Sequence, residues 1–391
     1  MSIEFRKGTY HFHDEPNFNY QMNRWVAFDN LPIQEVKKAT EKINNLNDWK
    51  REFMRLAEEA KSTGDVKKQA CYYRAVDFFL PHSDQDKQVI YDKLVGLFRE
   101  TYKEYFDQKV ILEKEVAYDG IKLPVYYVPN RSGKQSKGTI LFTGGFDCYK
   151  EELIPVMIFF AEQGFDFYYF EGPGQGEVLQ KYYYPMTPQW EKPVKAVLDA
   201  FQLNEVTLIG LSLGGYLAPR AAAYEPRIKR VIAWGAIYDF YQVVSTRRGP
   251  GLAMFIHSMT ALRFSGLFNF IVGIKMRKDA YIYWGIDHGM HVMGTASPYK
   301  YFQKLKLFHT RKISPMIKQD FLLLAGSEDH FCDMDQFYKQ TQLLTNVRSF
   351  TGRIFTAEES AENHCQFGNL ELALKQMVNW IETIDMDRDR R

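Results

Sequence analysis

The sequence predicts an α/β fold in which a mostly parallel sheet is flanked by helices, preceded by a helical segment and interrupted by a helical insertion. Three observations support this prediction. Helical spacing of apolar residues runs through the first 107 residues, short apolar runs alternate with helical segments from residue 108, and this alternation stops between residues 238 and 313. Continuous apolar runs are typical of strands that are buried on both faces, so these runs should pair in parallel.

Residues 1–107 are predicted to form an N-terminal helical domain. Ile90 and Leu94 fall on one face of a helix in the stretch SDQDKQVIYDKLVGLFRETYKEYF, and Trp49 and Phe53 fall on one face of another helix. This part of the chain has almost no strand signal. We therefore expect one helical unit ahead of the sheet.

Residues 108–237 and 314–385 are predicted to form the α/β core. Its first two strands should form a hairpin that turns at Asp119-Gly120, within KVILEKEVAYDGIKLPVYYVP. The later strands are expected in the runs TILFTGG, FDFYYFEG, EVTLIGLS, IKRVIAWGAI and DFLLLAGSED. Residues 238–313 separate the last two runs and are rich in aromatic residues and methionine, so they are predicted to be a helical cap insertion.

Composition excludes several classes of function. The chain has 391 residues, a formal net charge of +2 and no basic block that could follow a phosphate backbone, so nucleic acid is not an expected partner. The first residues, MSIEFRKGTYHFHDE, lack the apolar segment of a signal peptide, and no apolar run approaches membrane-spanning length. We expect a cytoplasmic protein without a membrane partner.

Neither a metal nor another cofactor is expected. The four cysteines show no paired CxxC spacing, and the histidine pairs HFH and HGMH have no companion ligands at a recognisable zinc spacing. The run FEGPGQGE suggests a dinucleotide-binding loop, but Glu177 stands where the third glycine of that fingerprint belongs and Pro173 removes a backbone donor.

The stretch IGLSLGGYLAPRAA contains the main catalytic signal. Ser212 lies between an apolar strand and a small-residue helix, and Gly210 and Gly214 flank it in a GxSxG pattern. A tight strand-to-helix turn holds a nucleophile clear of its backbone only where the flanking side chains are nearly absent. Ser212 is therefore the candidate nucleophile.

A serine hydroxyl needs a base to take its proton, and the base needs a carboxylate to orient it. In a fold with this type of turn, both groups follow the serine along the chain. Asp329, which comes just after the run DFLLLAG, is the expected carboxylate, with Glu328 as the fallback. His364, in the polar loop TAEESAENHCQFGN before the final helix, is the expected base.

Two backbone amides should stabilise the oxyanion of a tetrahedral intermediate. One is the N–H of Leu213, directly after the nucleophile, and the other is the N–H of Phe146, in the loop where Gly145 allows the chain to approach closely. Loops beside the nucleophile and the aromatic insertion supply the residues expected to contact substrate, which are Gly145, Asp147, Glu151, Gln175 and Trp284.

Together these motifs resemble the α/β-hydrolase superfamily and, more narrowly, the helical-cap serine hydrolases that include 2,6-dihydropseudooxynicotine hydrolase and the fungal hydrolases that shorten polyketide chains. The resemblance covers nearly the whole chain and rests on FNYQMNRW, GGFDCYKEE, FEGPGQGE, GLSLGG, GSEDHF and ENHCQFGN. It implies a triad of Ser212, Asp329 and His364, and an active site covered jointly by the N-terminal helices and the insertion. Dimers are common among these relatives, so the resemblance also implies a homodimer as one option. Some relatives carry Glu in place of Asp147.

We therefore expect a serine hydrolase that forms an acyl-enzyme and cleaves an acyl bond of a small, largely apolar or aromatic substrate. The bond is either a carboxylic ester or a C–C bond next to a ketone, and the triad alone does not separate the two. Three alternatives stay open at this point: an aminopeptidase or amidase type of activity, acyl transfer with cyclisation on the same triad, and a non-catalytic binding protein of the same fold.

Overall fold

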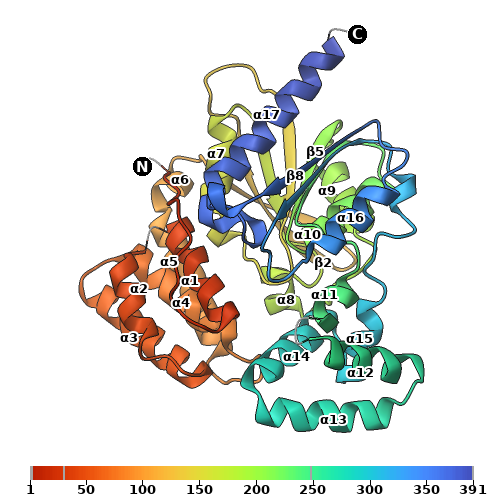
Figure 1. Cartoon of the computed structure of the whole chain (residues 1–391). Helices are drawn as coiled ribbons and strands as arrows, with labels where there is room; N and C mark the ends of the chain where they lie inside the picture. Colours follow the sequence, from red (N-terminus) through yellow and green to blue (C-terminus); the bar gives the residue numbers. More distant parts are fainter. Residues whose placement is uncertain (1–2, 30, 247–248, 390–391) are drawn as a thin grey trace.

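A central sheet organises the computed structural model, which describes residues 3–29, 31–246 and 249–389. Within these residues eight strands pair in the order β1-β2-β4-β3-β5-β6-β7-β8 (Figure 1). The strands are β1 (Leu112–Tyr118), β2 (Ile121–Val128), β3 (Thr139–Thr143), β4 (Asp166–Phe170), β5 (Val206–Leu211), β6 (Ile228–Trp234), β7 (Asp320–Gly326) and β8 (Ser349–Phe355). The strands from β3 to β8 are parallel, which confirms the predicted α/β class.

The antiparallel part of the sheet is the predicted hairpin. β1 and β2 pair from Leu112 opposite Tyr127 to Tyr118 opposite Ile121, and the turn between them is Asp119-Gly120. Both turn residues have positive φ, which is the geometry that matches the twist of two paired strands. β2 then runs antiparallel to β4 and joins the hairpin to the parallel strands.

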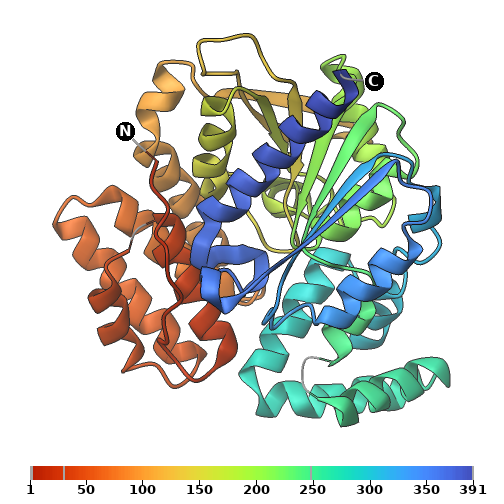
Figure 2. The same cartoon turned by 45° about the horizontal axis from the view of Figure 1, so that its top comes forward.

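Side chains from the two faces of the sheet enter two separate apolar cores. In β5, Leu208 belongs to one core and Ile209 to the other, as expected for the two-residue period of a strand. One face is covered by α7 (Ile154–Glu162) and α17 (Leu370–Asp389), which cross it side by side (Figure 2). The other face is covered by α8 (Gly176–Tyr182), α9 (Glu191–Ala200), α10 (Gly214–Ala222) and α16 (Met334–Leu343).

The N-terminal part is helical, as the apolar spacing predicts. It consists of α1 (Pro16–Asp29), α2 (Ile33–Thr40), α3 (Leu46–Ser62), α4 (Val66–Phe79), α5 (Lys87–Thr101) and α6 (Lys103–Asp107). Trp49 is fully buried and stacks on Phe18, with ring centroids 4.5 Å apart. Its indole N–H donates to the carbonyl of Ala75, so α1, α3 and α4 meet at this side chain. These helices share one apolar core with α7 and α17.

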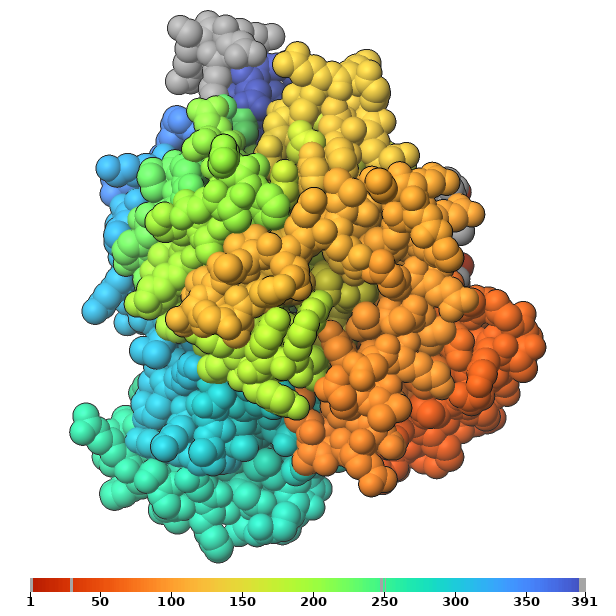
Figure 3. All heavy atoms as spheres, turned by 180° about the vertical axis from the view of Figure 1, so that it is seen from behind, coloured from red at the N-terminus to blue at the C-terminus, as the bar shows by residue number. Residues whose placement is uncertain are grey.

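The chain between β6 and β7 is also helical. It contains α11 (Phe240–Thr246), α12 (Pro250–Ala261), α13 (Ser265–Lys278), α14 (Ala280–Met293) and α15 (Pro298–Leu305). The indole N–H of Trp284 donates to the carbonyl of Phe78 over 2.8 Å, which joins α14 to α4. From behind, the segment that follows α8 lies between this insertion and the N-terminal helices (Figure 3), and there the Met186 N–H donates to Val292.

Membrane-spanning helices were sought in the described residues, and none of their helices combines the length and the apolar character that a bilayer crossing needs.

The turn from β5 into α10 is only two residues long. Ser212 has a φ of 59°, in the left-handed region, and its N–H donates to the carbonyl of Trp234 in the neighbouring strand. A Cβ atom at Gly210 would lie 2.0 Å from the carbonyl oxygen of Gly214 and 2.9 Å from the Cβ atom of Ala218. The helix packs on its own strand only because residue 210 has no side chain.

Gly210→Ala should lower the free energy of unfolding by about 3 kcal/mol, because the added methyl group meets backbone that has no room to move. Gly96→Ala is the matched control, since an added Cβ in the exposed part of α5 meets no atom within 4 Å. That substitution should stabilise the protein by about 0.5–1 kcal/mol. Urea unfolding of the two variants measures both effects, and equal stabilities would contradict the close packing at Gly210.

Candidate active site

Three loops at the carboxyl ends of parallel strands bring the predicted serine, histidine and aspartate together. Ser212 follows β5, Asp329 follows β7 and His364 follows β8. The Nε2 atom of His364 lies 2.8 Å from the Ser212 Oγ atom, and its Nδ1 atom lies 2.6 Å from an Asp329 carboxylate oxygen. This is the hydrogen-bonding order that a nucleophile, a base and an orienting carboxylate need.

Burial and charge set the protonation of the histidine and the aspartate. Burial lowers the pKa of His364, but the negative charge and hydrogen bond of Asp329 outweigh burial and raise that pKa well above its ordinary value. Burial raises the pKa of Asp329, but His364 and a backbone N–H donor outweigh it and lower the pKa. The carboxylate therefore stays ionised and stabilises the imidazolium ion.

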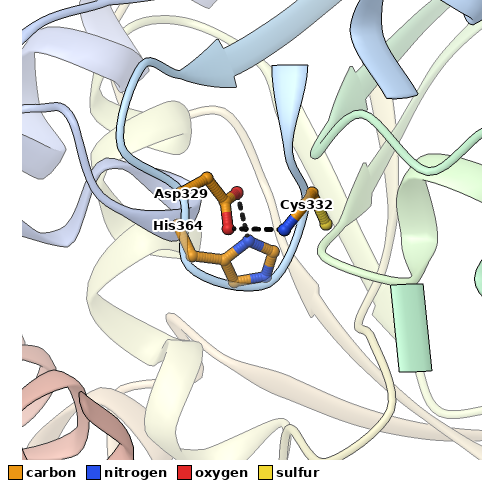
Figure 4. Close-up of side chains that lie close together, drawn as sticks. All are labelled: Asp329, Cys332 and His364. Carbon is orange, nitrogen blue, oxygen red and sulfur yellow. Dashed lines mark hydrogen bonds and ion pairs between the residues drawn. The ribbon is translucent and has the colours of Figure 1, made fainter. Parts of the chain in front are cut away.

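The loop after β7 holds the carboxylate in place (Figure 4). One Asp329 oxygen accepts the N–H groups of Phe331 and Cys332, over 2.8 and 2.9 Å, and the other faces His364. The Cys332 thiol is buried beside them, and potential ligand atoms of Asp329, Cys332 and His364 lie within 4.8 Å of one another. Burial raises the pKa of Cys332 to about 12, so this sulfur is a protonated thiol at neutral pH when no cation is bound.

The loop that carries His364 is strained and tied down from two sides. Cys365 and Gln366 both have a φ of 54°, which is uncommon for residues other than glycine. The Gln366 side-chain oxygen accepts the indole N–H of Trp234 in β6, and the His364 carbonyl accepts the Tyr20 hydroxyl of α1. Sequence reasoning missed Tyr20, because nothing in the periodicity of α1 shows which distant loop it contacts.

The two amides predicted for the oxyanion are available. Among the described residues, neither the Leu213 N–H nor the Phe146 N–H donates a hydrogen bond to another group. A Cβ atom at Gly145 would lie 2.8 Å from the Ser212 Cβ atom and 3.2 Å from the Leu213 nitrogen, so glycine is what lets the loop after β3 reach the serine.

Gln175 holds that loop rather than facing the cavity. Its amide nitrogen donates to the carbonyls of Gly144 and Gly145, over 2.8 and 3.0 Å, and its oxygen accepts the Gly172 N–H. Glu151 is buried in an ion pair with Lys150, at 2.7 Å. The structure therefore keeps two of the expected substrate contacts away from the cavity surface.

A cavity of about 480 Å³ opens over Ser212 and His364. Among the residues expected to contact substrate, Asp147 and Trp284 line it, and Gly145 packs directly against Ser212. The remaining walls come from α1, from the loop after β7 and from the insertion helices. The cavity is large enough for a small organic molecule.

A buried ion cluster fastens the N-terminal helices to the loop after β3. Arg24 of α1 pairs with Glu152 at 2.8 Å, and Arg74 of α4 pairs with the same carboxylate at 3.3 Å and with Asp77 at 3.2 Å. Arg74 also donates to the carbonyl of Asp147, next to the oxyanion loop. Sequence reasoning missed this cluster, because its members are charged residues from segments far apart in the chain.

Three histidines lie where the N-terminal helices meet the insertion. The His82 and His291 rings stack with centroids 3.6 Å apart, and a hydrogen bond of 3.1 Å joins His82 to His288. The His288 ring packs edge-on against Phe146 and lines the cavity. Burial lowers the pKa of His288 to about 3 and that of His291 to about 4, so both rings are neutral.

The chain is similar to several fungal hydrolases. It is 28% identical to hydrolase acrC of Aspergillus aculeatus, with 72% of this chain and 74% of that protein aligned. It is 29% identical to the alpha/beta hydrolase psoB of Aspergillus fumigatus, over 70% and 69%, and 30% identical to 20-hydroxy-prefusarin hydrolase FUS2 of Gibberella moniliformis, over 62% of each. No family model matches the chain.

Two solved structures share the fold over nearly the whole chain. The crystal structure of 2,6-dihydroxy-pseudo-oxynicotine hydrolase superposes with a TM-score of 0.64 at 18% identity, covering 92% of this chain and 94% of that one. AbyA5 superposes with a TM-score of 0.68 at 16% identity, covering 93% and 94%. The chain therefore has the α/β-hydrolase fold, and over about 70% of its length it is similar to fungal proteins named as hydrolases.

The carboxylate of Asp329 should control the titration of His364. In the unaltered protein the His364 pKa should lie above the ordinary histidine value of about 6.5. In Asp329→Asn it should fall by roughly 1–3 units, because burial then acts without the compensating negative charge. Nitrogen NMR of the labelled imidazole measures both values.

Asp199→Asn, which alters an exposed aspartate that pairs with Lys195, is the control and should leave the His364 titration unchanged. A His364 pKa that is equal in the Asp329 variant and in the unaltered protein would contradict the buried pair.

Proposed function

We propose that the protein is a serine hydrolase that cleaves an acyl bond of a small, largely apolar substrate through a Ser212–His364–Asp329 triad. The observation that carries this proposal is the continuous hydrogen-bonded path from Ser212 Oγ through His364 to Asp329, at 2.8 and 2.6 Å, on the wall of a 480 Å³ cavity. The similarity to fungal proteins named as hydrolases supports the same class of reaction.

In the first half of the proposed reaction the acyl group of the substrate is transferred to Ser212. His364 Nε2 takes the proton of Ser212 while Oγ attacks the substrate carbonyl, and the resulting oxyanion accepts hydrogen bonds from the Leu213 and Phe146 amides. His364 then passes its proton to the leaving atom as the bond to the carbonyl carbon breaks. The products of this half are an acyl-enzyme and the protonated leaving group.

In the second half water repeats the attack. His364 takes a proton from water, the hydroxide adds to the acyl carbon, and the tetrahedral intermediate expels Ser212, which recovers its proton from the imidazole. Each half needs neutral His364 at its start. Because Asp329 raises the pKa of His364, the rate should increase with pH through a midpoint above the ordinary histidine value.

Ser212→Ala should abolish covalent labelling by a fluorophosphonate and lower the rate of ester hydrolysis by about 10⁴-fold or more, because the nucleophile is removed. Ser62→Ala is the matched control, since this hydroxyl lies on an exposed helix end and bonds only to the Glu59 carbonyl. It should label and hydrolyse like the unaltered protein. Well-folded unaltered protein that resists labelling would favour the non-catalytic binding protein.

A substrate panel should separate ester cleavage from C–C cleavage. Carbon–carbon hydrolysis expels a carbanion and therefore needs a ketone in the leaving fragment to carry the charge, whereas an ester expels an alkoxide directly. p-Nitrophenyl esters and β-diketones of matched size, followed by absorbance and product analysis, report the two reactions. Fast turnover of short esters with none of the diketones would exclude the C–C reaction, and cyclic or transferred products would show acyl transfer.

A further inference from the structure

The two sides of the cavity differ in chemistry. Helix α1 contributes a polar wall, because Asn17, Gln21 and Arg24 recur at helical spacing on the face that lines the cavity. The opposite wall comes from the insertion helices and is mostly apolar, although Lys275 and His288 also line it. Its members include Val243, Val244, Leu252, Ile256, Val272 and Phe302.

The site geometry assigns the polar wall to the leaving group. The Tyr20 ring of α1 lies 6.0 Å from the His364 ring, and its hydroxyl bonds to the His364 carbonyl, so the turn of α1 that carries Tyr20 and Gln21 stands on the histidine side. Arg24, one turn further along α1, reaches Asp147 beside the oxyanion loop. Phe146, on the oxyanion side, packs its ring 5.3 Å from Phe240 of the insertion. Because a catalytic histidine protonates the leaving atom, the leaving group faces α1 and the acyl group faces the insertion.

Most polar groups of α1 are already committed to the protein. Asn17 donates to the Glu15 carboxylate over 3.0 Å, and Tyr20 donates to the His364 carbonyl over 3.2 Å. Arg24 pairs with Glu152 at 2.8 Å. Within the described residues, the Gln21 side chain has one such contact, through its oxygen to Arg24.

Gln21 presents a donor to the cavity. Its side-chain oxygen accepts from the Arg24 guanidinium over 3.5 Å, and since an arginine only donates, the oxygen must be the atom on that side. The amide nitrogen donates to no other group in the described residues, although Gln21 is only 2% exposed. An amide donor on the cavity wall that has no protein partner favours a ligand that supplies an acceptor.

The acceptor should carry no charge. The Arg24 guanidinium beside Gln21 is already matched by Glu152, and the Asp147 carboxylate lies 3.9 Å from it. A carboxylate placed beside Arg24 would meet these two negative groups, and Arg24 itself is already paired. A neutral carbonyl oxygen meets no such repulsion.

From these contacts we propose that the leaving group carries an uncharged carbonyl oxygen, of a ketone or an amide, that accepts a hydrogen bond from Gln21. The acyl group is then aliphatic and lies against the insertion. This inference rests on the proposed function, because it takes Ser212 and His364 as the reacting groups. It adds a substrate class, with an aliphatic acyl group and a carbonyl-bearing leaving group, and it names Gln21 as the residue that recognises the leaving group.

Two nearly isosteric esters test the inference. 3-Oxobutyl hexanoate and 3-methylbutyl hexanoate differ only where a carbonyl replaces a methyl-bearing carbon in the leaving group. The measurement is the ratio of their kcat/KM values. Gln21→Leu should lower this ratio about fivefold, because the hydrogen bond to the leaving-group carbonyl is lost. Comparing variants cancels the different intrinsic reactivities of the two esters.

Controls separate recognition from damage to the fold. Gln85→Leu, on the surface, should leave the ratio unchanged. Gln21→Glu keeps the size of the side chain but removes both amide donors, and it should lower the ratio as Gln21→Leu does. Ile256→Trp should lower kcat/KM for hexanoates more than for acetates of the same alcohol. It should leave unchanged the oxo-to-methyl ratio, which is kcat/KM for 3-oxobutyl hexanoate divided by kcat/KM for 3-methylbutyl hexanoate.

The outcomes distinguish the two levels of the proposal. The role of Gln21 is overturned if the unaltered enzyme is active and both Gln21 variants keep its ratio of kcat/KM values for the two hexanoates. It is also overturned if Gln85→Leu lowers this ratio as much as the Gln21 variants do. If Ile256→Trp changes the oxo-to-methyl ratio instead of the acyl preference, the assignment of the two walls is overturned. Unaltered protein that cleaves neither ester and resists the fluorophosphonate contradicts the proposed function itself.

Discussion

The buried hydrogen bond between Asp329 and His364 is the interaction on which the rest of the site depends. An ionised carboxylate inside the protein is costly unless donors surround it, and the loop after β7 supplies two backbone N–H groups in addition to the imidazole. Those donors fix the carboxylate, the carboxylate fixes the ring, and the ring places Nε2 beside Ser212. Each of the three side chains needs its strand end in register with the others, which the parallel pairing of β5, β6, β7 and β8 provides.

The N-terminal helices take part in this arrangement as much as the sheet does. Tyr20 holds the backbone of the histidine loop, and Arg24 and Arg74 converge on Glu152 beside the loop that carries Phe146. A single helical unit thus contacts both sides of the nucleophile. In the described residues it also meets the insertion, through the bond from Trp284 to Phe78, so the cavity is enclosed by parts of the chain from before, within and after the sheet.

Much of this structure could be predicted from the sequence because its signals are local. Apolar runs identified the strands from β3 to β7, Asp119-Gly120 identified the hairpin turn, and the glycines around Ser212 identified the turn into α10. Glu151 and Gln175 were predicted to contact substrate, but neither lines the cavity, because local sequence signals do not specify side-chain partners. Both lie in loops beside the site, yet Glu151 turns to Lys150 and Gln175 turns to the backbone of Gly144. Which partner a polar side chain chooses depends on the tertiary structure, and no spacing rule encodes it.

The contact between Tyr20 and His364 joins residues 344 positions apart in the chain. Such a separation gives the site an exceptionally non-local topology, and non-local contacts form late because the intervening chain must first be ordered. During synthesis α1 emerges before the histidine loop, and its native contacts with α3 and α4 are available to it earlier than its contact with His364. Ser212, the histidine loop and the hydroxyl of Tyr20 therefore come together only after residue 364 has been synthesised.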